Sequence, residues 1–127
     1  MSLLKTVLYV QVRPNRMSVR NVTAQKSVDR ASATNFSHPR TLIGDFTVAD
    51  AFLKTLVAEA RSGFSLRTEI LMHPLDRVEG GLSQVEERVF RELAMGDGAS
   101  KAGVHVGATL SDPEVVAKLE AGSSPGG

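Results

Sequence analysis

The chain has 127 residues, 42% of them hydrophobic and 23% charged, which is typical of one soluble globular domain. It contains no cysteine, so disulfides and thiolate metal sites are excluded. The net charge of +1 hides an asymmetry: residues 1–40 carry seven basic residues and one acidic residue, and the remainder carries eight and thirteen. These balances of +6 and −5 are typical of a nucleic-acid-binding or self-complementary surface, although solvated arginines on exposed strands explain them more simply.

The first predicted strand covers residues 6–13, an alternating segment in which three apolar side chains share one face: Leu8, Val10 and Val12. The apolar run at residues 3–12 is too short to span a membrane and has no signal-peptide cleavage site. We therefore expect a cytoplasmic protein with no membrane span.

Two further strands follow the first. Pro14 and Asn15 form a turn, because proline fixes one backbone dihedral and asparagine tolerates a left-handed one. Residues 17–22 are predicted to return antiparallel, and residues 25–32 form a polar strand suited to a sheet edge. Together these segments predict a three-stranded meander, followed by a polar loop over residues 33–40.

The longest apolar periodicity lies in residues 41–63 and predicts an amphipathic helix. Its apolar stripe contains Val48, Phe52, Leu53, Leu56, Val57 and Ala60. Thr47 is the predicted N-cap, with Asp50 in the reciprocal capping-box position, and Gly63 is predicted to end the helix. We expect a sheet to cover the stripe and Phe52 to anchor the core.

Strands and helices alternate in the second half of the chain. The expected elements are a strand over residues 66–72 that ends at His73 and Pro74, a helix from Ser83 to residues 96–98, a buried strand over residues 104–106 and a helix opening at residues 111–114. Ser83 and Glu86 form a capping-box pattern at the start of the second helix. The apolar stripe predicted for that helix contains Val85, Val89, Phe90, Leu93 and Ala94.

This order predicts an α/β fold in which a three-stranded antiparallel meander is followed by β-α-β units, giving a mixed five-stranded sheet with about three helices. We assign residues 1–121 to a single domain and residues 122–127 to a flexible tail. The layout is ribonuclease-H-like, and it is also that of one half of an actin-type ATPase.

Three segments resemble the bacterial actin family of MreB, the rod-shape-determining protein. Residues 42–48, LIGDFTV, resemble the start of that family's corresponding helix, and residues 83–88, SQVEER, resemble the start of its next helix. Residues 96–99 resemble its glycine-rich helix end, and residues 111–117 resemble its Glu-Glu-Pro segment followed by an alanine-rich helix. The resemblance covers one subdomain, usually called IA, and implies an actin-like half-domain.

The chain departs from the family at the nucleotide site. The family's first hairpin carries an Asp-x-Gly-Thr loop that binds phosphate and metal, and the matching positions here are Gln11, Arg13 and Pro14. Glutamine supplies no anionic charge for a divalent ion, arginine blocks close backbone approach, and proline removes an N–H donor. Glu86 matches the glutamate that orients the attacking water in the family, but without phosphates a helix cap explains it more simply. We therefore expect no catalytic residue, cofactor or metal.

The three histidines are candidates for a metal or general-base site. His73 and His105 are expected on neighbouring strands, where they could approach each other, whereas His38 lies apart in sequence. No carboxylate stands beside them at ligand spacing, which favours core or strand-end histidines. Tyr9 is the single aromatic residue on the basic strands, so a base-stacking platform is poorly supported.

The resulting hypothesis is a non-enzymatic, MreB-like module that acts through protein–protein contact in cell shape or cytoskeletal organisation. The candidate interaction residues are Arg13, Arg16, Arg20 and Arg30, and the charge polarity favours a homo-oligomer. One alternative is a small ribonuclease-H-like metal-dependent hydrolase, although the first three strands contain Asp29 as their one carboxylate. The other is a nucleic-acid-binding module that uses the basic meander, which is the less favoured partner class.

Overall fold

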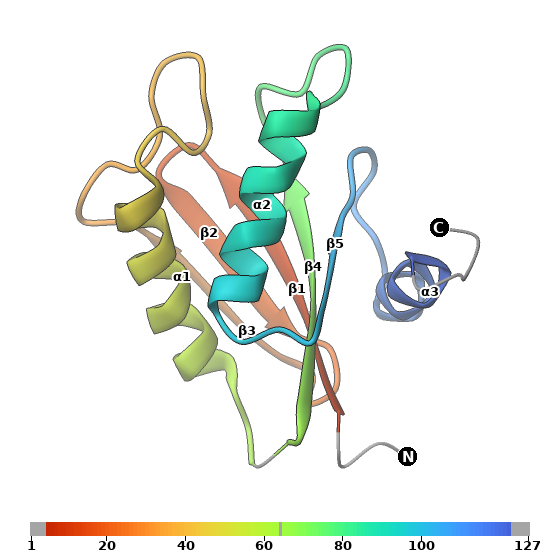
Figure 1. The fold of residues 1–127 in the computed structure, drawn as a ribbon. Coiled ribbons are helices and arrows are strands. Elements are labelled where there is room, and N and C mark those ends of the chain that lie inside the picture. Colours follow the sequence, from red (N-terminus) through yellow and green to blue (C-terminus); the bar gives the residue numbers. More distant parts are fainter. Residues whose placement is uncertain (1–4, 64, 123–127) are drawn as a thin grey trace.

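The computed structural model describes residues 5–63 and 65–122, which form one sheet with helices on both faces (Figure 1). The elements are β1 (Lys5–Arg13), β2 (Arg16–Asn21), β3 (Lys26–Ala31), α1 (Phe46–Ala60), β4 (Arg67–Pro74), α2 (Gln84–Gly96), β5 (Lys101–Val104) and α3 (Asp112–Gly122). The strand order is β3-β2-β1-β4-β5. β1, β2 and β3 pair antiparallel, whereas β4 pairs parallel with β1 and β5 pairs parallel with β4. The predicted α/β class, meander, polar edge strand and mixed five-stranded sheet are confirmed.

β1 is the central strand and is buried on both faces. Leu8, Val10 and Val12 pack into the main core beneath α1 and α2. Val7 and Tyr9 point to the opposite face and pack into a smaller core beneath α3. The alternation predicted for this strand therefore separates the two layers of the protein.

The start of α1 differs from the prediction. The N-cap is Asp45, whose side chain accepts a hydrogen bond from the Val48 N–H at 3.1 Å, and Thr47 lies inside the helix. Asp50 pairs instead with Lys54, one turn further along. Aspartate is as strong an N-cap as threonine, and the Asp45 N–H is already held by a loop carbonyl, so the helix begins earlier.

The end of α1 also differs from the prediction. The helix ends at Ala60, with Arg61 as its C-cap, so Gly63 lies beyond the cap although its φ is +70°. The Ala60 carbonyl accepts a hydrogen bond from Asn21 Nδ2 at 3.0 Å. A buried asparagine on β2 therefore satisfies the end of this helix, and a glycine cap is not needed.

Two strand boundaries were wrong. β4 continues through His73 and Pro74, because the Leu75 N–H still bonds the Val12 carbonyl of β1 at 2.9 Å. β5 covers Lys101–Val104 and not residues 104–106, because the short turn after α2 brings the chain back to β4 earlier. His105 adds one bond beyond the strand, from its N–H to the Met72 carbonyl.

The two later helices largely follow the sequence pattern. The capping box at the start of α2 is present, with reciprocal hydrogen bonds between Ser83 and Glu86. Phe90, Leu93 and Ala94 are buried as predicted, but Val85 is 72% exposed. Gly122, which was assigned to the tail, is the last residue of α3, and residues 123–127 of that tail lie outside the described part of the chain.

The loop between β3 and α1 contributes an unexpected core residue. Phe36 has no exposed surface, and its ring centroid lies 6.0 Å from that of Phe52. Phe52, the predicted anchor, is only partly buried. A polar loop composition therefore concealed one of the largest fully buried side chains.

We expect Phe36→Ala to lower the free energy of unfolding by about 3–5 kcal/mol, the usual loss for truncating a buried phenylalanine. Phe52→Ala removes the same group from a partly exposed position and should cost less. Urea unfolding of the two variants and the parent measures both values. An equal or smaller loss for Phe36→Ala would mean that this loop is not part of the core.

Candidate functional site

The tip of the β1–β2 hairpin is bonded to the chain's own loop. Asn15 has a φ of +55° and accepts hydrogen bonds at its side-chain Oδ1 from the N–H groups of Phe36 and Ser37, both at 2.8 Å. Its own N–H donates to Ser37 Oγ at 3.0 Å, and its carbonyl accepts from the Ser32 N–H at 2.9 Å. The turn that would face phosphate in an actin-type hairpin is therefore joined to residues 32–37.

The same loop shapes the segment that leads into α1. His38 and Thr41 form a two-bond antiparallel bridge, and Ser37 Oγ donates to the Leu42 carbonyl at 2.6 Å. Gly44 packs so closely that a Cβ atom there would lie 2.2 Å from Cγ of the His38 ring. This contact explains a glycine in the LIGDFTV segment and fixes residues 41–43 against the body of the protein.

A groove of about 200 Å³ lies between residues 41–43, the loop after β4 and the first two turns of α2. Most of its lining is apolar, and its charged side chains are Asp76, Arg77 and Glu86. The remaining lining residues are Thr41, Leu42, Ile43, Leu82, Val85, Val89 and Phe90. The groove lies beyond the carboxyl end of β4, the side of a parallel sheet on which α/β proteins bind their ligands.

The charged groups of the groove differ in how many hydrogen bonds they already form within the chain. Glu86 accepts a hydrogen bond from the Ser83 N–H, so its carboxylate serves the helix cap. Arg77 has a left-handed φ of +55°, and its Nε donates to the Pro39 carbonyl at 2.8 Å. Its buried Nη1 lies 3.4 Å from Asp76 Oδ1 but forms no hydrogen bond within the described residues. The groove therefore offers apolar surface with a rim that carries one more carboxylate than guanidinium.

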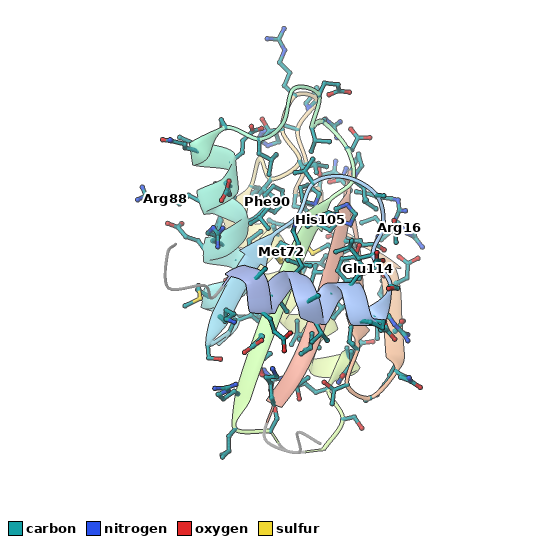
Figure 2. All side chains as sticks on the ribbon, turned by 90° about the vertical axis from the view of Figure 1, so that its right-hand side faces the viewer. Arg16, Met72, Arg88, Phe90, His105 and Glu114 are labelled. Atoms are coloured by element: carbon teal, nitrogen blue, oxygen red, sulfur yellow. The ribbon has the colours of Figure 1, made fainter. Side chains whose placement is uncertain are left out.

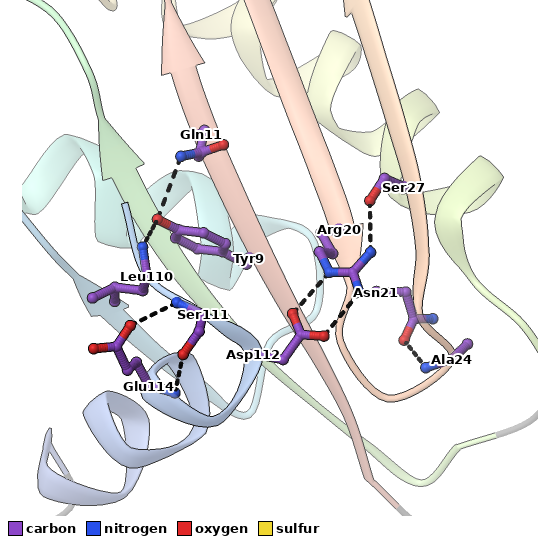
Figure 3. Close-up of polar contacts among 10 residues, drawn as sticks. All are labelled: Tyr9, Gln11, Arg20, Asn21, Ala24, Ser27, Leu110, Ser111, Asp112 and Glu114. Carbon is purple, nitrogen blue, oxygen red and sulfur yellow. Dashed lines mark hydrogen bonds and ion pairs between the residues drawn. The ribbon is translucent and has the colours of Figure 1, made fainter. Parts of the chain in front are cut away.

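Three of the four arginines predicted for interaction form ion pairs within the chain. Arg20 donates from Nε and Nη2 to both carboxylate oxygens of Asp112, at 2.8 Å each (Figure 3). This contact joins β2 to the start of α3, and the hydrogen bond from Arg20 lowers the pKa of Asp112. Charge reversal at Arg20 would therefore disturb the fold as well as the surface.

Two of the other predicted arginines, Arg30 and Arg16, are also ion-paired within the chain. Arg30 pairs with Glu59 through both guanidinium Nη atoms and joins β3 to α1, and Arg16 pairs with Asp29 across the β2–β3 ladder at 3.0 Å. Arg13 is exposed and has no ion pair among residues 5–63 and 65–122. Much of the +6 and −5 polarity is thus neutralised inside one molecule.

His73 and His105 do approach each other, with ring centroids 4.7 Å apart. His73 Nδ1 lies 2.6 Å from the Tyr9 hydroxyl, and its Nε2 lies 2.9 Å from the Gly107 carbonyl, which makes Nε2 the donor and Nδ1 the acceptor. The Tyr9 oxygen also accepts from the Leu110 N–H at 3.1 Å (Figure 3). Burial lowers the pKa of His73, so the neutral ring is favoured.

These contacts fasten the segment after β5 onto the sheet. His105 Nε2 bonds the Ala108 carbonyl at 2.9 Å, and Gln11 Nε2 bonds Thr109 Oγ1 at 3.2 Å. His38 lies elsewhere, in the loop before α1. Within the described residues, no three His, Asp or Glu side chains are grouped as metal ligands. The histidine cluster has a structural explanation in the attachment of residues 105–111.

Asp97, the C-cap of α2, carries a half-buried carboxyl that sequence reasoning missed. Burial raises its pKa to about 6, against the opposing effect of Arg61 and Lys54. Its Oδ2 has no hydrogen-bond partner in the described part of the chain. The sequence showed only a helix-stop pattern, because the charge became buried when α1 packed beside it.

The fold and groove define a small α/β protein with a mixed five-stranded sheet and an apolar surface groove beside α2. No family model matches the chain. It is 37% identical over 126 residues to the "Uncharacterized protein YjaA" of Escherichia coli (strain K12), across 91% of this chain and 98% of that protein. The chain therefore belongs to the YjaA family. None of the helices, over the residues described, is long and apolar enough to cross a membrane.

The raised pKa of Asp97 predicts a pH-dependent stability. The folded protein holds this proton more tightly than the unfolded chain, where the carboxyl has its ordinary pKa of 3.8. The protonated carboxyl therefore contributes fully to the free energy of unfolding below about pH 4, and this contribution is lost as the pH rises through about 6. Asp97→Asn should raise the free energy of unfolding by about 1–2 kcal/mol at pH 8, less than the full shift implies because solvent screens a half-buried carboxyl, and have little effect at pH 4.

Urea unfolding at the two pH values measures this difference. Glu79→Gln, which removes an exposed carboxylate, is the matched control and should show no such pH-dependent gain. A gain of equal size at pH 4 and pH 8 in Asp97→Asn would contradict the raised pKa of this half-buried carboxyl.

Proposed function

We propose that this chain is a non-enzymatic module that binds another protein, and that the groove beside α2 receives the partner. The observation that supports this proposal best is Val85, an apolar side chain that is 72% exposed although it lines a mostly apolar groove. An exposed apolar side chain continuous with a concave apolar surface is typical of protein–protein contact. The groove's volume of about 200 Å³ is also small for a drug-sized ligand and suits anchoring side chains.

The rim determines which partner segment fits. Asp76 and Glu86 face the groove together with Arg77, so a small negative excess surrounds an apolar floor. A segment with apolar anchors and a neighbouring lysine or arginine would complement both features. The buried, unbonded Nη1 of Arg77 could in addition donate to a backbone carbonyl of that segment.

The architecture that we propose is an actin-like half-domain with a degenerate nucleotide site. The strand order β3-β2-β1-β4-β5 supports the ribonuclease-H-like layout, and the MreB resemblance of residues 42–48 and 83–88 supports its actin-like form. The hydrogen bonds of Asn15 support the loss of ATP binding, since the hairpin tip contacts the chain's own loop. With this architecture we also propose a cytoplasmic location and a role in cell-shape or cytoskeletal organisation.

The alternative functions have less support. Asp29, the carboxylate on the meander, is ion-paired with Arg16 at the exposed sheet edge, which is poor geometry for a hydrolytic metal centre. Arg20 and Arg30 are held by Asp112 and Glu59, which removes two guanidinium groups of the meander from contact with phosphates. Protein binding remains the function that the described contacts favour.

The experiment compares two charge insertions in a tagged protein used for capture from the native cell. Leu82→Glu places a charge in the lining of the groove, whereas Val106→Glu places the same charge at a position that is 41% exposed and outside the groove. We expect proteins captured by the parent to be retained by Val106→Glu and reduced at least about tenfold by Leu82→Glu. Equal retention by both variants would show that the groove is not the binding site.

A further inference from the structure

The outward face of α2 carries four side chains that their own chain leaves uncovered. Val85 and Met95 are 72% and 52% exposed, and Arg88 projects away from the body of the protein (Figure 2). Arg88 and Glu92 are exposed and make no ion pair or hydrogen bond with another described residue. The spacing of these four positions, three, four and three residues apart, is that of a single helix–helix seam.

Glu87 and Arg91, the neighbouring charged residues on α2, do form contacts within the chain. Arg91 pairs with Glu87 at 3.0 Å and donates from Nη1 to the Ala102 carbonyl of β5 at 2.8 Å. These contacts hold Arg91 against its own chain, beside the seam. The unpaired charges of α2 are therefore confined to the outward face, where they alternate with exposed apolar groups.

We propose that this face binds α2 of a second copy of the chain, with the two helices antiparallel about a twofold axis near residue 90. In that arrangement Val85 faces Met95 of the second copy, and Arg88 faces Glu92 of the second copy. Symmetry generates each contact twice, giving two ion pairs flanked by two apolar contacts. A parallel arrangement would place Arg88 against Arg88, so the charges select the antiparallel one.

The self-complementarity of the face is what identifies a second copy as the partner. The same four side chains supply both halves of the contact, and each unpaired charge finds its opposite. The inference goes beyond the proposed function, because it concerns the outward face of α2, of which only Val85 also lines the groove. Since α2 has 13 residues, the contact is only about 20 Å long, and we expect a dimer that dissociates in the micromolar range.

The test compares charge-reversal variants, alone and mixed with each other. Sedimentation velocity measures the dimer fraction over a series of protein concentrations up to about 100 μM. Arg88→Glu alone and Glu92→Arg alone each place like charges across the contact, and each should weaken the dimer at least about tenfold. An equimolar mixture of the two variants should restore dimers, because opposite charges then meet at both pairs. Lys118→Glu, a reversal on the exposed side of α3, is the control and should leave the parent's dimerisation unchanged.

Three results would overturn the proposal: a monomeric parent throughout the concentration range, single variants that associate as well as the parent, or a mixture no more dimeric than its components. Arg88 and Glu92 do not line the groove, so their reversal leaves its lining unchanged and the capture experiment tests the groove separately. Both substituted side chains are exposed, and far-UV circular dichroism of each variant verifies that the fold is retained.

A second measurement tests the register directly. The chain contains no cysteine, so introduced thiols give unambiguous cross-links. Under mild oxidation, a mixture of Val85→Cys and Met95→Cys chains should form a disulfide between the two variants. Each variant alone should cross-link poorly, because the two copies of either position lie about 15 Å apart along the helix axis. Homodimeric cross-linking of Val85→Cys as efficient as that of the mixture would exclude the antiparallel arrangement.

Discussion

The hydrogen bonds of Asn15 are the constraint on which the groove end of this protein depends. The hairpin turn needs a residue that tolerates a φ of +55°, and asparagine meets that need while its side chain remains free to accept bonds. It uses both acceptor positions on the N–H groups of Phe36 and Ser37. Phe36 enters the core from that point, and its carbonyl receives the N–H groups of Gly44 and Asp45 at the start of α1. One side chain thus positions the loop that forms a wall of the groove.

The sequence predicted the parts of the fold that rest on local periodicity. β1, the meander and the stripes of α1 and α2 follow from alternation and helical spacing, which any one segment displays by itself. The errors arose where distant segments decide the outcome. Asn21 of β2 bonds the end of α1, and Asn15 of the hairpin brings Phe36 into the core. The residues adjacent to either asparagine in the sequence do not predict these contacts. The groove was missed for the same reason, because three separated segments build it.

The charge asymmetry of the chain shows how composition can mislead. A basic N-terminal third and an acidic remainder suggested attraction between molecules, but Arg20 and Arg30 cross to Asp112 and Glu59 within one molecule. These pairs fasten α3 and α1 to the sheet, so they connect the two halves of the sequence. On α2, by contrast, Arg88 and Glu92 are exposed and form no ion pair within the described residues. That helix buries one face, borders the groove with a second and presents Arg88 and Glu92 on a third.

Amide hydrogen exchange of Asn15→Gly tests the central claim most directly. Glycine keeps the left-handed turn and removes only the side chain that holds the loop. The account predicts faster exchange at the amides of Phe36, Ser37 and residues 42–45, with the β1–β2 ladder and the β4 amides as protected as in the parent. Unchanged protection at Phe36 and Ser37 would contradict the account, because the groove wall would then be held by something other than Asn15.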